Sequence, residues 1–247
     1  MSGIVLEVSS LNKEYPAFRL ENVSFSMPKG SITGFIGRNG AGKTTTIKSI
    51  LNLVHRSGGE IRFFGLDLAE HENEIKSRIG YAGGAVSYYK KKKIRDIVAV
   101  TKTFYSNWDD AAYQKYLKAF DLDEDKTPEQ LSEGMKVKLN LTLALSHKAE
   151  LLILDEPTSG LDPISRDELL DIFEALRDKG VSILFSTHIT SDLDKCADHI
   201  IYIRQGRIVA SGRTDEWVAS CAERGIGRNL EEIMLHYEKE DFHEKLA

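Results

Sequence analysis

The stretch Gly37-Arg38-Asn39-Gly40-Ala41-Gly42-Lys43-Thr44 decides the fold of this chain of 247 residues. It matches the pattern G-x-x-x-x-G-K-[ST], in which glycines let backbone N–H groups approach phosphate oxygens closely. Ser31–Ile36 reads as a strand leading into it, and Thr44–Leu53 reads as the helix that follows. Because such a helix points its positive end at bound phosphates, the stretch predicts a nucleotide-binding loop between a strand and a helix.

Polar side chains suited to a magnesium nucleotide occur in two places. Lys43 supplies a point charge for the β- and γ-phosphates, and the Thr44 hydroxyl suits a Mg²⁺ ligand. The apolar run Leu151–Leu154 is typical of a buried parallel strand, and it leads directly to Asp155 and Glu156. We expect Asp155 to hold Mg²⁺ directly or through water, although a surface Asp-Glu pair at a strand end is the alternative.

The composition is that of an ordinary globular protein, with 41% hydrophobic and 29% charged residues. A formal net charge of −5 gives no global electrostatic reason to bind nucleic acid, and no such partner is expected. Cys196 and Cys221 have no metal-ligand spacing, which favours a reducing compartment over a disulfide framework. No apolar run approaches the roughly 18–20 residues that span a bilayer, and we expect no signal peptide.

The order of apolar patterns predicts an α/β fold: a P-loop NTPase (RecA-like) core, an N-terminal antiparallel β subdomain and an inserted α-helical subdomain. We expect residues 1–84 and 149–213 to form the ATP-binding core, 85–148 the helical subdomain and 214–247 C-terminal helices. Asp162-Pro163 predicts a helix start, and Gly180 predicts its end. The expected strands are Ile4–Val8, Phe18–Ser26, Ser31–Ile36, Gly58–Gly65, Ile79–Ala82, Leu151–Leu154, Val181–Ser186, Ile200–Arg204 and Arg207–Ala210.

A further segment, Leu131-Ser132-Glu133-Gly134-Met135, stands shortly before the run that ends in Asp155-Glu156. Together with the phosphate-binding loop it resembles the ATP-binding cassette (ABC) ATPases, in which two such domains clamp ATP between them. The family signature reads L-S-G-G-Q, so Ser132 and Gly134 are retained while Glu133 and Met135 depart from it. The variant with methionine resembles type-2 ABC exporters more than importers.

The resemblance implies catalytic roles for three side chains and a role in metal binding for others. Glu156 would polarise the attacking water, and Lys43 would neutralise phosphate charge. His188, which follows a predicted strand, matches the switch histidine that contacts the γ-phosphate; a lone structural histidine is the alternative. Asp155 would be the Walker-B aspartate that shares Mg²⁺ with Thr44.

The resemblance also implies two groups of residues that bind nucleotide. Tyr15 would stack on adenine, although a packing tyrosine is the alternative. Ser132 and Gly134 would form an anion site at a helix N-terminus and grip the γ-phosphate of ATP bound to the other subunit, while Ser159–Asp162 would contact that subunit. The loop residues implied to contact ATP are Gly37, Arg38, Asn39, Gly40, Ala41, Gly42, Lys43, Thr44 and Thr45.

One loop departs from the family pattern. Family members usually carry glutamine, sometimes glutamate, after a strand resembling Ile79-Gly80-Tyr81, whereas this chain has a glycine at the expected position, Gly84. The missing side chain predicts slow hydrolysis by the isolated subunit rather than weak ATP binding. The following run Tyr88-Tyr89-Lys90-Lys91-Lys92-Lys93 fits either a solvated basic face or a docking or lipid-headgroup patch.

The sequence thus predicts an ATP-binding and ATP-hydrolysing subunit of an ABC transporter, with ATP and Mg²⁺ as ligands. It would dimerise on MgATP with a second nucleotide-binding subunit, identical or different, and drive export through a separate integral membrane subunit. That places it at the cytoplasmic face of the cell membrane, as a peripheral protein. The alternative is a soluble ABC ATPase in protein or cofactor assembly. A DNA-repair or translation ABC ATPase is disfavoured because the sequence lacks a long coiled coil, a second cassette and a basic face.

Overall fold

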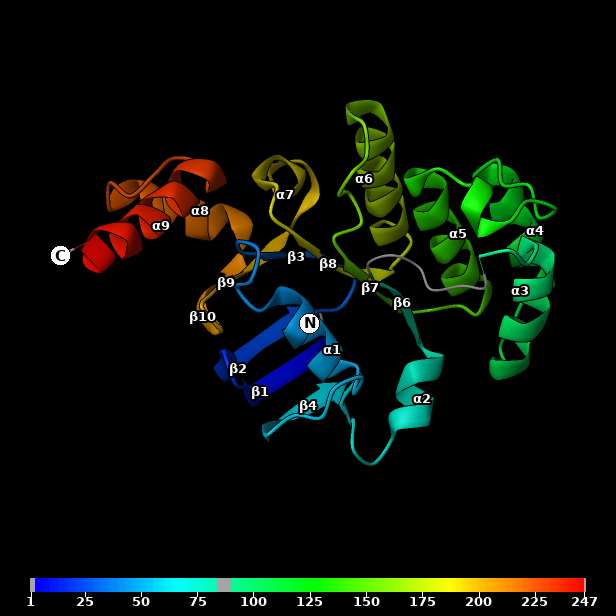
Figure 1. Ribbon diagram of the computed structural model, residues 1–247, viewed down its shortest axis with the longest axis horizontal. Coiled ribbons are helices and arrows are strands. Elements are labelled where there is room, and N and C mark those ends of the chain that lie inside the picture. The colour runs from blue at the N-terminus through cyan, green and yellow to red at the C-terminus, as the bar shows by residue number, and fades with distance from the viewer. Residues whose placement is uncertain (1–2, 84–89, 247) are drawn as a thin grey trace.

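Two β-sheets with helices packed around them form the computed structural model, which describes residues 3–83 and 90–246 (Figure 1). The larger sheet has the strand order β10-β9-β3-β8-β7-β6. All neighbours in it are parallel except the β9–β10 pair, an antiparallel hairpin. Its strands are β3 (Ile32–Ile36), β6 (Ile79–Gly83), β7 (Leu151–Asp155), β8 (Ser182–Thr187), β9 (His199–Arg204) and β10 (Arg207–Arg213).

The smaller sheet is antiparallel, with the order β2-β1-β4-β5. Its strands are β1 (Ile4–Tyr15), β2 (Phe18–Pro28), β4 (Gly58–Phe63) and β5 (Leu66–Asp67). The first strand is longer than the predicted Ile4–Val8. Its pairing with β2 shifts register between Val8 and Leu11, and Ser10 has φ = +51°. This bulge interrupts the alternation of side chains, which is why the sequence pattern predicts a strand that ends at Val8.

Helices flank both sheets and extend the molecule at each end (Figure 1). Helix α1 lies between the two sheets, α3 to α5 gather at one end, and α8 and α9 lie at the other. The helices are α1 (Lys43–Ile50), α2 (Glu72–Ser77), α3 (Ile94–Thr101), α4 (Asp110–Ala119), α5 (Glu133–Ser146), α6 (Pro163–Arg177), α7 (Thr190–Cys196), α8 (Thr214–Glu223) and α9 (Leu230–Leu246).

Strand β7 shows why the middle of the larger sheet is apolar on both faces. Leu151 and Ile153 belong to the core cluster shared with α1 and the smaller sheet. Leu152 and Leu154 belong to the cluster on the opposite face, which includes residues of α6 and α7. Successive side chains of a strand point to opposite faces, so a strand covered on both sides reads as a continuous apolar run. This packing fixes the position of Asp155 at the end of the strand.

The helices at one end have a core of their own, with Ile94, Val98, Tyr113, Leu117 and Leu139 among its buried members. It contains residues of α3, α4 and α5, in the segment for which helical periodicity predicts an inserted subdomain. No helix within the described residues combines the length and the apolarity needed to cross a membrane.

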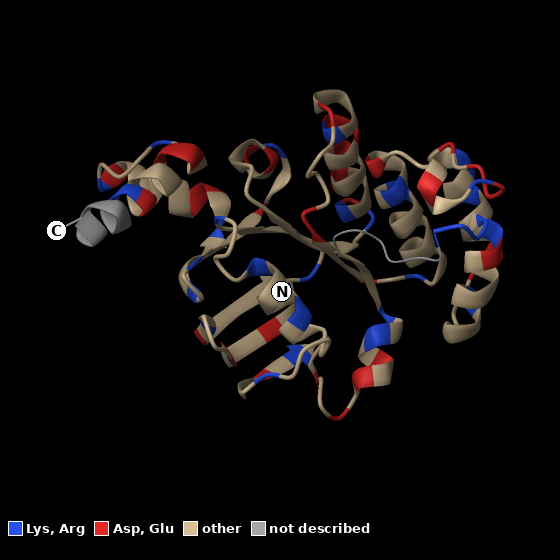
Figure 2. Ribbon diagram, viewed as in Figure 1, with Lys and Arg blue, Asp and Glu red and all other residues tan. Residues whose placement is uncertain are grey.

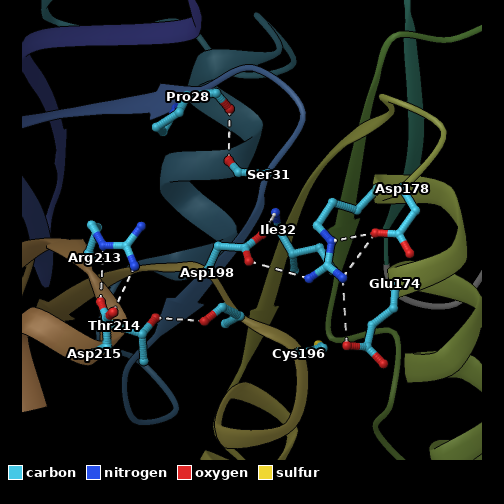
Figure 3. A network of polar contacts seen from close by, with 12 residues as sticks. Pro28, Ser31, Ile32, Glu174, Asp178, Cys196, Asp198, Arg213, Thr214 and Asp215 are labelled. Atoms are coloured by element: carbon cyan, nitrogen blue, oxygen red, sulfur yellow. Dashed lines mark hydrogen bonds and ion pairs between the residues drawn. The ribbon is translucent and has the colours of Figure 1, made fainter. Parts of the chain in front are cut away.

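A polar network ties α8 to the core (Figure 3). Asp198, just before β9, accepts a hydrogen bond from the Ile32 backbone N–H (2.8 Å) and pairs with Arg177 of α6 (3.3 Å). The Thr214 hydroxyl at the start of α8 donates to the Ala197 carbonyl at 2.8 Å. These bonds connect β3, α6 and α8 through the connection between α7 and β9.

The predicted α/β fold class, with its antiparallel β portion and its inserted helices, is confirmed. The short elements α2, β5 and α7 were not predicted, because segments of two to seven residues carry too few apolar repeats to be recognised. Asp162 is the N-cap of α6, and its side chain accepts from the Ile164 and Ser165 N–H groups. The helix ends at Arg177, three residues before the predicted stop at Gly180.

Candidate active site

The phosphate-binding loop joins β3 to α1, and packing requires glycine at two of its positions. A Cβ on Gly37 would lie 2.4 Å from the Ile203 carbonyl oxygen. Gly42 has φ = +115°, and a Cβ there would lie 2.8 Å from Leu20 Cδ2. Any side chain at these positions would push the loop away from the strands beneath it. The two glycines therefore let the loop pack tightly on β9 and β2, which fixes the N-terminus of α1.

A cavity of about 450 Å³ opens over this loop. It is adjoined by a second cavity of about 550 Å³, which Tyr15 lines and which shares Ala17, Phe18 and Gly40 with the first. Tyr15 is 43% exposed, and Lys13 Nζ lies 4.8 Å from its ring centroid. Its accessible ring suits stacking, a role that stays a prediction. The first cavity is lined by Ala17, Phe18, Arg38, Asn39, Gly40, Gly42, Lys43, Thr44, Thr45 and Glu156.

Lys43 is the buried cation of the site, only 5% exposed. Its Nζ donates to the Gly37 carbonyl at 2.6 Å and to the Arg38 carbonyl at 3.3 Å. The same Nζ lies 3.1 Å from Glu156 Oε1. A buried ammonium without partners is costly, so these acceptors hold the charge at the floor of the cavity.

Glu156 connects Lys43 to the predicted switch histidine. Its second carboxylate oxygen lies 2.9 Å from His188 Nδ1. Its backbone has φ = +54°, a left-handed conformation that L-residues seldom adopt, and its N–H donates to Ser186 Oγ at 2.9 Å. Backbone strain of this kind persists where the surroundings enforce it, often at functional sites. The structure thus brings Lys43, Glu156 and His188 together from three separate elements.

Asp155 lies at the end of β7 and is 7% exposed. Its Oδ1 accepts a short hydrogen bond of 2.6 Å from Ser186 Oγ, the same hydroxyl that accepts from the Glu156 N–H. Ser186 therefore fixes both acidic residues. Sequence reasoning assigns no role to this serine, because its contact with the acidic residues depends on the β7–β8 register. The signal that could have pointed to it is its place two residues before His188.

The residues present suit Mg²⁺. Thr44 lines the cavity, and Asp155 adjoins Glu156, which also lines it. Within the described residues, no group of three or more His, Cys, Asp or Glu side chains could hold a metal by itself. Mg²⁺ keeps several waters and takes few carboxylates, with phosphate oxygens completing its shell. A hydroxyl and one carboxylate are therefore a fitting protein contribution.

Ser132 and Gly134 lie elsewhere, at the start of α5. The Ser132 side chain is the N-cap of this helix and accepts from the Met135 N–H at 3.2 Å. A Cβ on Gly134 would be 3.7 Å from Leu161, so the helix end adjoins the segment after Glu156. Neither residue lines the loop cavity, and Figure 1 shows α5 well apart from α1. One chain does not unite its two predicted phosphate-binding elements.

Two sequence features near β6 have different outcomes. Gly84, the position predicted to lack the usual glutamine, lies outside the described residues, as do Tyr88 and Tyr89. The preceding Gly83 pairs in register with Asp155, which places the end of β6 beside the acidic pair. Lys90–Lys93 leads into α3, as the basic segment in Figure 2 shows, and its last residue pairs with Asp125 at 2.9 Å.

Comparisons with known proteins agree with this geometry. A family model described as ABC transporter matches residues 20–159. The chain is 34% identical over 213 residues to the lantibiotic transport ATP-binding protein SrtF of Streptococcus pyogenes, covering 85% of this chain and 92% of that protein. It is 32% identical to the daunorubicin/doxorubicin resistance ATP-binding protein DrrA of Streptomyces peucetius, covering 94% and 70%. A solved ATP-binding subunit of an ABC transporter matches with a TM-score of 0.82 and 31% identity, covering 94% and 98%.

Proposed function

Since the chain belongs to the ABC transporter family of ATP-binding, ATP-hydrolysing proteins, we propose that it powers export through a separate membrane subunit. The observation that supports catalysis at this site is the contact of Lys43, Glu156 and His188 at the loop cavity. It joins the phosphate-binding element to a carboxylate able to orient water.

The proposed reaction is phosphoryl transfer to water. The bond between the γ-phosphorus and the bridging oxygen breaks while a bond to the water oxygen forms. Glu156 accepts a hydrogen bond from that water and orients it, and His188 contacts the γ-phosphate. Lys43 neutralises charge on the β- and γ-phosphates. Mg²⁺, when bound by Thr44 and Asp155, would spread the charge that develops on the leaving phosphate.

The ion pair between Lys43 and Glu156 supplies a link between binding and catalysis. Phosphate oxygens attract the same ammonium that now lies 3.1 Å from the Glu156 carboxylate. Arrival of the triphosphate therefore draws Lys43 away and leaves the carboxylate to the attacking water. Glu156 keeps its His188 contact and its backbone bond to Ser186 during this exchange.

The separation of α5 from the loop cavity supports a composite site between two subunits. The α5 N-terminus, where the Ser132 side chain accepts from the Met135 N–H, would grip the γ-phosphate of ATP held by the loop of a second nucleotide-binding subunit, identical or different. Helix α5 has 14 residues, long enough for its terminus to attract an anion.

The direction of transport is proposed from the relatives. Their names describe drug resistance, lantibiotic transport and, for BcrA of Bacillus licheniformis, bacitracin transport. These relatives favour export through an integral membrane subunit, with this chain at the cytoplasmic face of the cell membrane. They support the alternative, a soluble ATPase in protein or cofactor assembly, less well.

Steady-state hydrolysis of MgATP by the purified chain tests the proposed chemistry. Glu156→Gln removes the charge that orients water and leaves the phosphate cradle, so turnover should fall by about 100-fold or more while ATP affinity is kept. Glu60→Gln, at a carboxylate whose side chain is 71% exposed on β4, is the control and should match the wild type. A Glu156→Gln variant that turns over like the wild type would exclude Glu156 as the residue that orients the water.

A further inference from the structure

A buried carboxylate that sequence reasoning did not single out contacts the segments that carry Glu156 and His188, which we call the catalytic pair. Asp192, on α7, is 1% exposed, and its Oδ2 accepts a short hydrogen bond of 2.6 Å from the Thr158 hydroxyl. Thr158 is itself fully buried and lies two residues after Glu156. The bond therefore anchors the loop that begins at Glu156.

The same carboxylate contacts the segment that carries the switch histidine. Burial raises the pKa of Asp192, and hydrogen bonding from Thr158 and from Thr187 opposes that rise. Thr187 is fully buried, directly precedes His188, and accepts the Ile189 N–H at 3.0 Å. Its hydroxyl thus bonds to the backbone beside His188 and lies near the Asp192 carboxylate.

Arg166 of α6 completes the set around this carboxylate. Its Nε lies 3.9 Å from Asp192 Oδ1, and neither of these buried atoms has a hydrogen-bond partner among the described residues. The pair therefore attracts through charge alone at this distance. Helix α6 starts directly after the loop that contains Thr158, and Arg166 makes it the third segment that faces the Asp192 carboxylate.

The catalytic pair needs such an anchor because neither member is held by burial of its own side chain. His188 has a side chain that is 42% exposed, and the Glu156 side chain is 23% exposed. Glu156 also has a strained backbone that relaxes unless its neighbours are fixed. Asp192 accepts a hydrogen bond from Thr158, two residues after Glu156, and lies near Thr187, which precedes His188. Buried hydrogen bonds to a charged group are among the stronger ones available.

We propose that Asp192 is a positioning residue, which holds Glu156 and His188 in catalytic alignment through Thr158 and Thr187. Asp192 acts on the turnover number and not on ATP affinity, since Asp192, Thr158 and Thr187 do not line the loop cavity. The proposal rests on the proposed role of Glu156 as the residue that orients water.

Asp192→Asn is the first test, with Asp194→Asn on the same helix as the matched control. The amide keeps the side-chain shape but loses the negative charge, and its NH₂ must face either the Thr158 hydroxyl or the Arg166 guanidinium, each of which is a donor toward the native carboxylate. Turnover should fall about tenfold or more, because misplacing catalytic groups by a fraction of an ångström is costly. ATP affinity, measured by titration, should stay at the wild-type value, and Asp194→Asn should leave both unchanged.

A hydroxyl test covers the case in which Asp192→Asn does not fold. Thr158→Val keeps the shape of the side chain but loses the donor, and it should lower turnover, whereas Thr158→Ser should recover it. Wild-type turnover in Thr158→Val, or an equal loss of ATP affinity and turnover in Asp192→Asn, would overturn the proposal.

A double variant separates this proposal from the proposed function. If Asp192 acts in part through Glu156, adding Asp192→Asn to Glu156→Gln should lower the residual turnover by a smaller factor than Asp192→Asn lowers that of the wild type. A full additional loss in the double variant contradicts positioning through Glu156. If instead Glu156→Gln alone hydrolyses normally, the proposed function fails at Glu156 itself, whatever Asp192→Asn does.

Discussion

At the scale of single residues, the strongest electrostatic demand lies on Lys43. Its ammonium is buried against two backbone carbonyls and the Glu156 carboxylate. A buried cation is strongly stabilised by hydrogen bonds to triphosphate oxygens, and burying it without acceptors costs much free energy. Its role in the site therefore follows from its burial as much as from its place in the loop pattern.

Lys43→Ala removes this cation, and ATP affinity should fall at least about tenfold, since hydrogen bonds to charged groups contribute about 1.5–3 kcal/mol each. Lys48→Ala, an exposed lysine in the last turn of α1, is the matched control and should bind normally. Isothermal titration with ATP measures both variants. Wild-type affinity in Lys43→Ala would show that the loop backbone alone binds the phosphates.

Functional residues could be predicted where they form one continuous stretch of sequence. The loop from Gly37 to Thr44 could be recognised from its own pattern, and the pair Asp155-Glu156 from the apolar strand directly before it. Ser186 and Asp192 could not, because their partners lie 30 to 34 residues away and meet them only through the β7–β8 register and the docking of α7. No local pattern encodes such contacts.

At the scale of elements, α5 ends on a buried histidine. His147 is the C-cap residue of this helix, is 2% exposed, and stacks on Tyr105 with ring centroids 3.9 Å apart. Burial lowers the pKa of His147 to about 4, against a hydrogen bond to the Ser77 backbone that raises it. The folded chain thus keeps this imidazole neutral at neutral pH.

This shift predicts a loss of stability on acidification. The unfolded chain binds a proton at this histidine below about pH 6.5, whereas the fold resists it until about pH 4. Its contribution is therefore fully present above pH 6.5 and disappears as the pH falls toward 4. Between pH 7 and pH 5 the free energy of unfolding should fall by about 2 kcal/mol from this group.

Urea unfolding at pH 7 and pH 5 checks the prediction in two variants. His147→Gln should lose most of the difference between the two pH values that the wild type shows. His55→Gln, at an exposed position, should keep it. If the two variants respond to pH alike, the burial of His147 does not control acid stability.

Elements were predictable in proportion to their length and regularity. The run Leu151–Leu154 marked β7 because both faces of that strand are buried. Helices α2 and α7 have six and seven residues and were missed, although α7 carries Asp192. Their positions depend on packing against the sheet rather than on a periodic face of their own.

At the scale of the whole molecule, the two predicted phosphate-binding elements lie apart. The loop cavity lies at the end of β3, while the Ser132 cap lies at the start of α5 beyond the segment that follows Glu156. The sequence predicted both elements, and the structure shows that they do not meet within one chain. In the proposed composite site between two chains, the two elements of one chain would each serve a different ATP.

ATP-driven dimerisation tests this central claim most directly. Glu156→Gln, incubated with MgATP and measured by size-exclusion chromatography with light scattering, should have twice the mass of one chain. Adding Ser132→Arg places a bulky cation at the α5 N-terminus and should return the mass to that of a monomer, with ATP affinity retained. Adding Ser57→Arg, at an exposed position between α1 and β4 that does not line the loop cavity, should leave the dimer intact. A double variant with Ser132→Arg that still dimerises on MgATP would contradict the composite site.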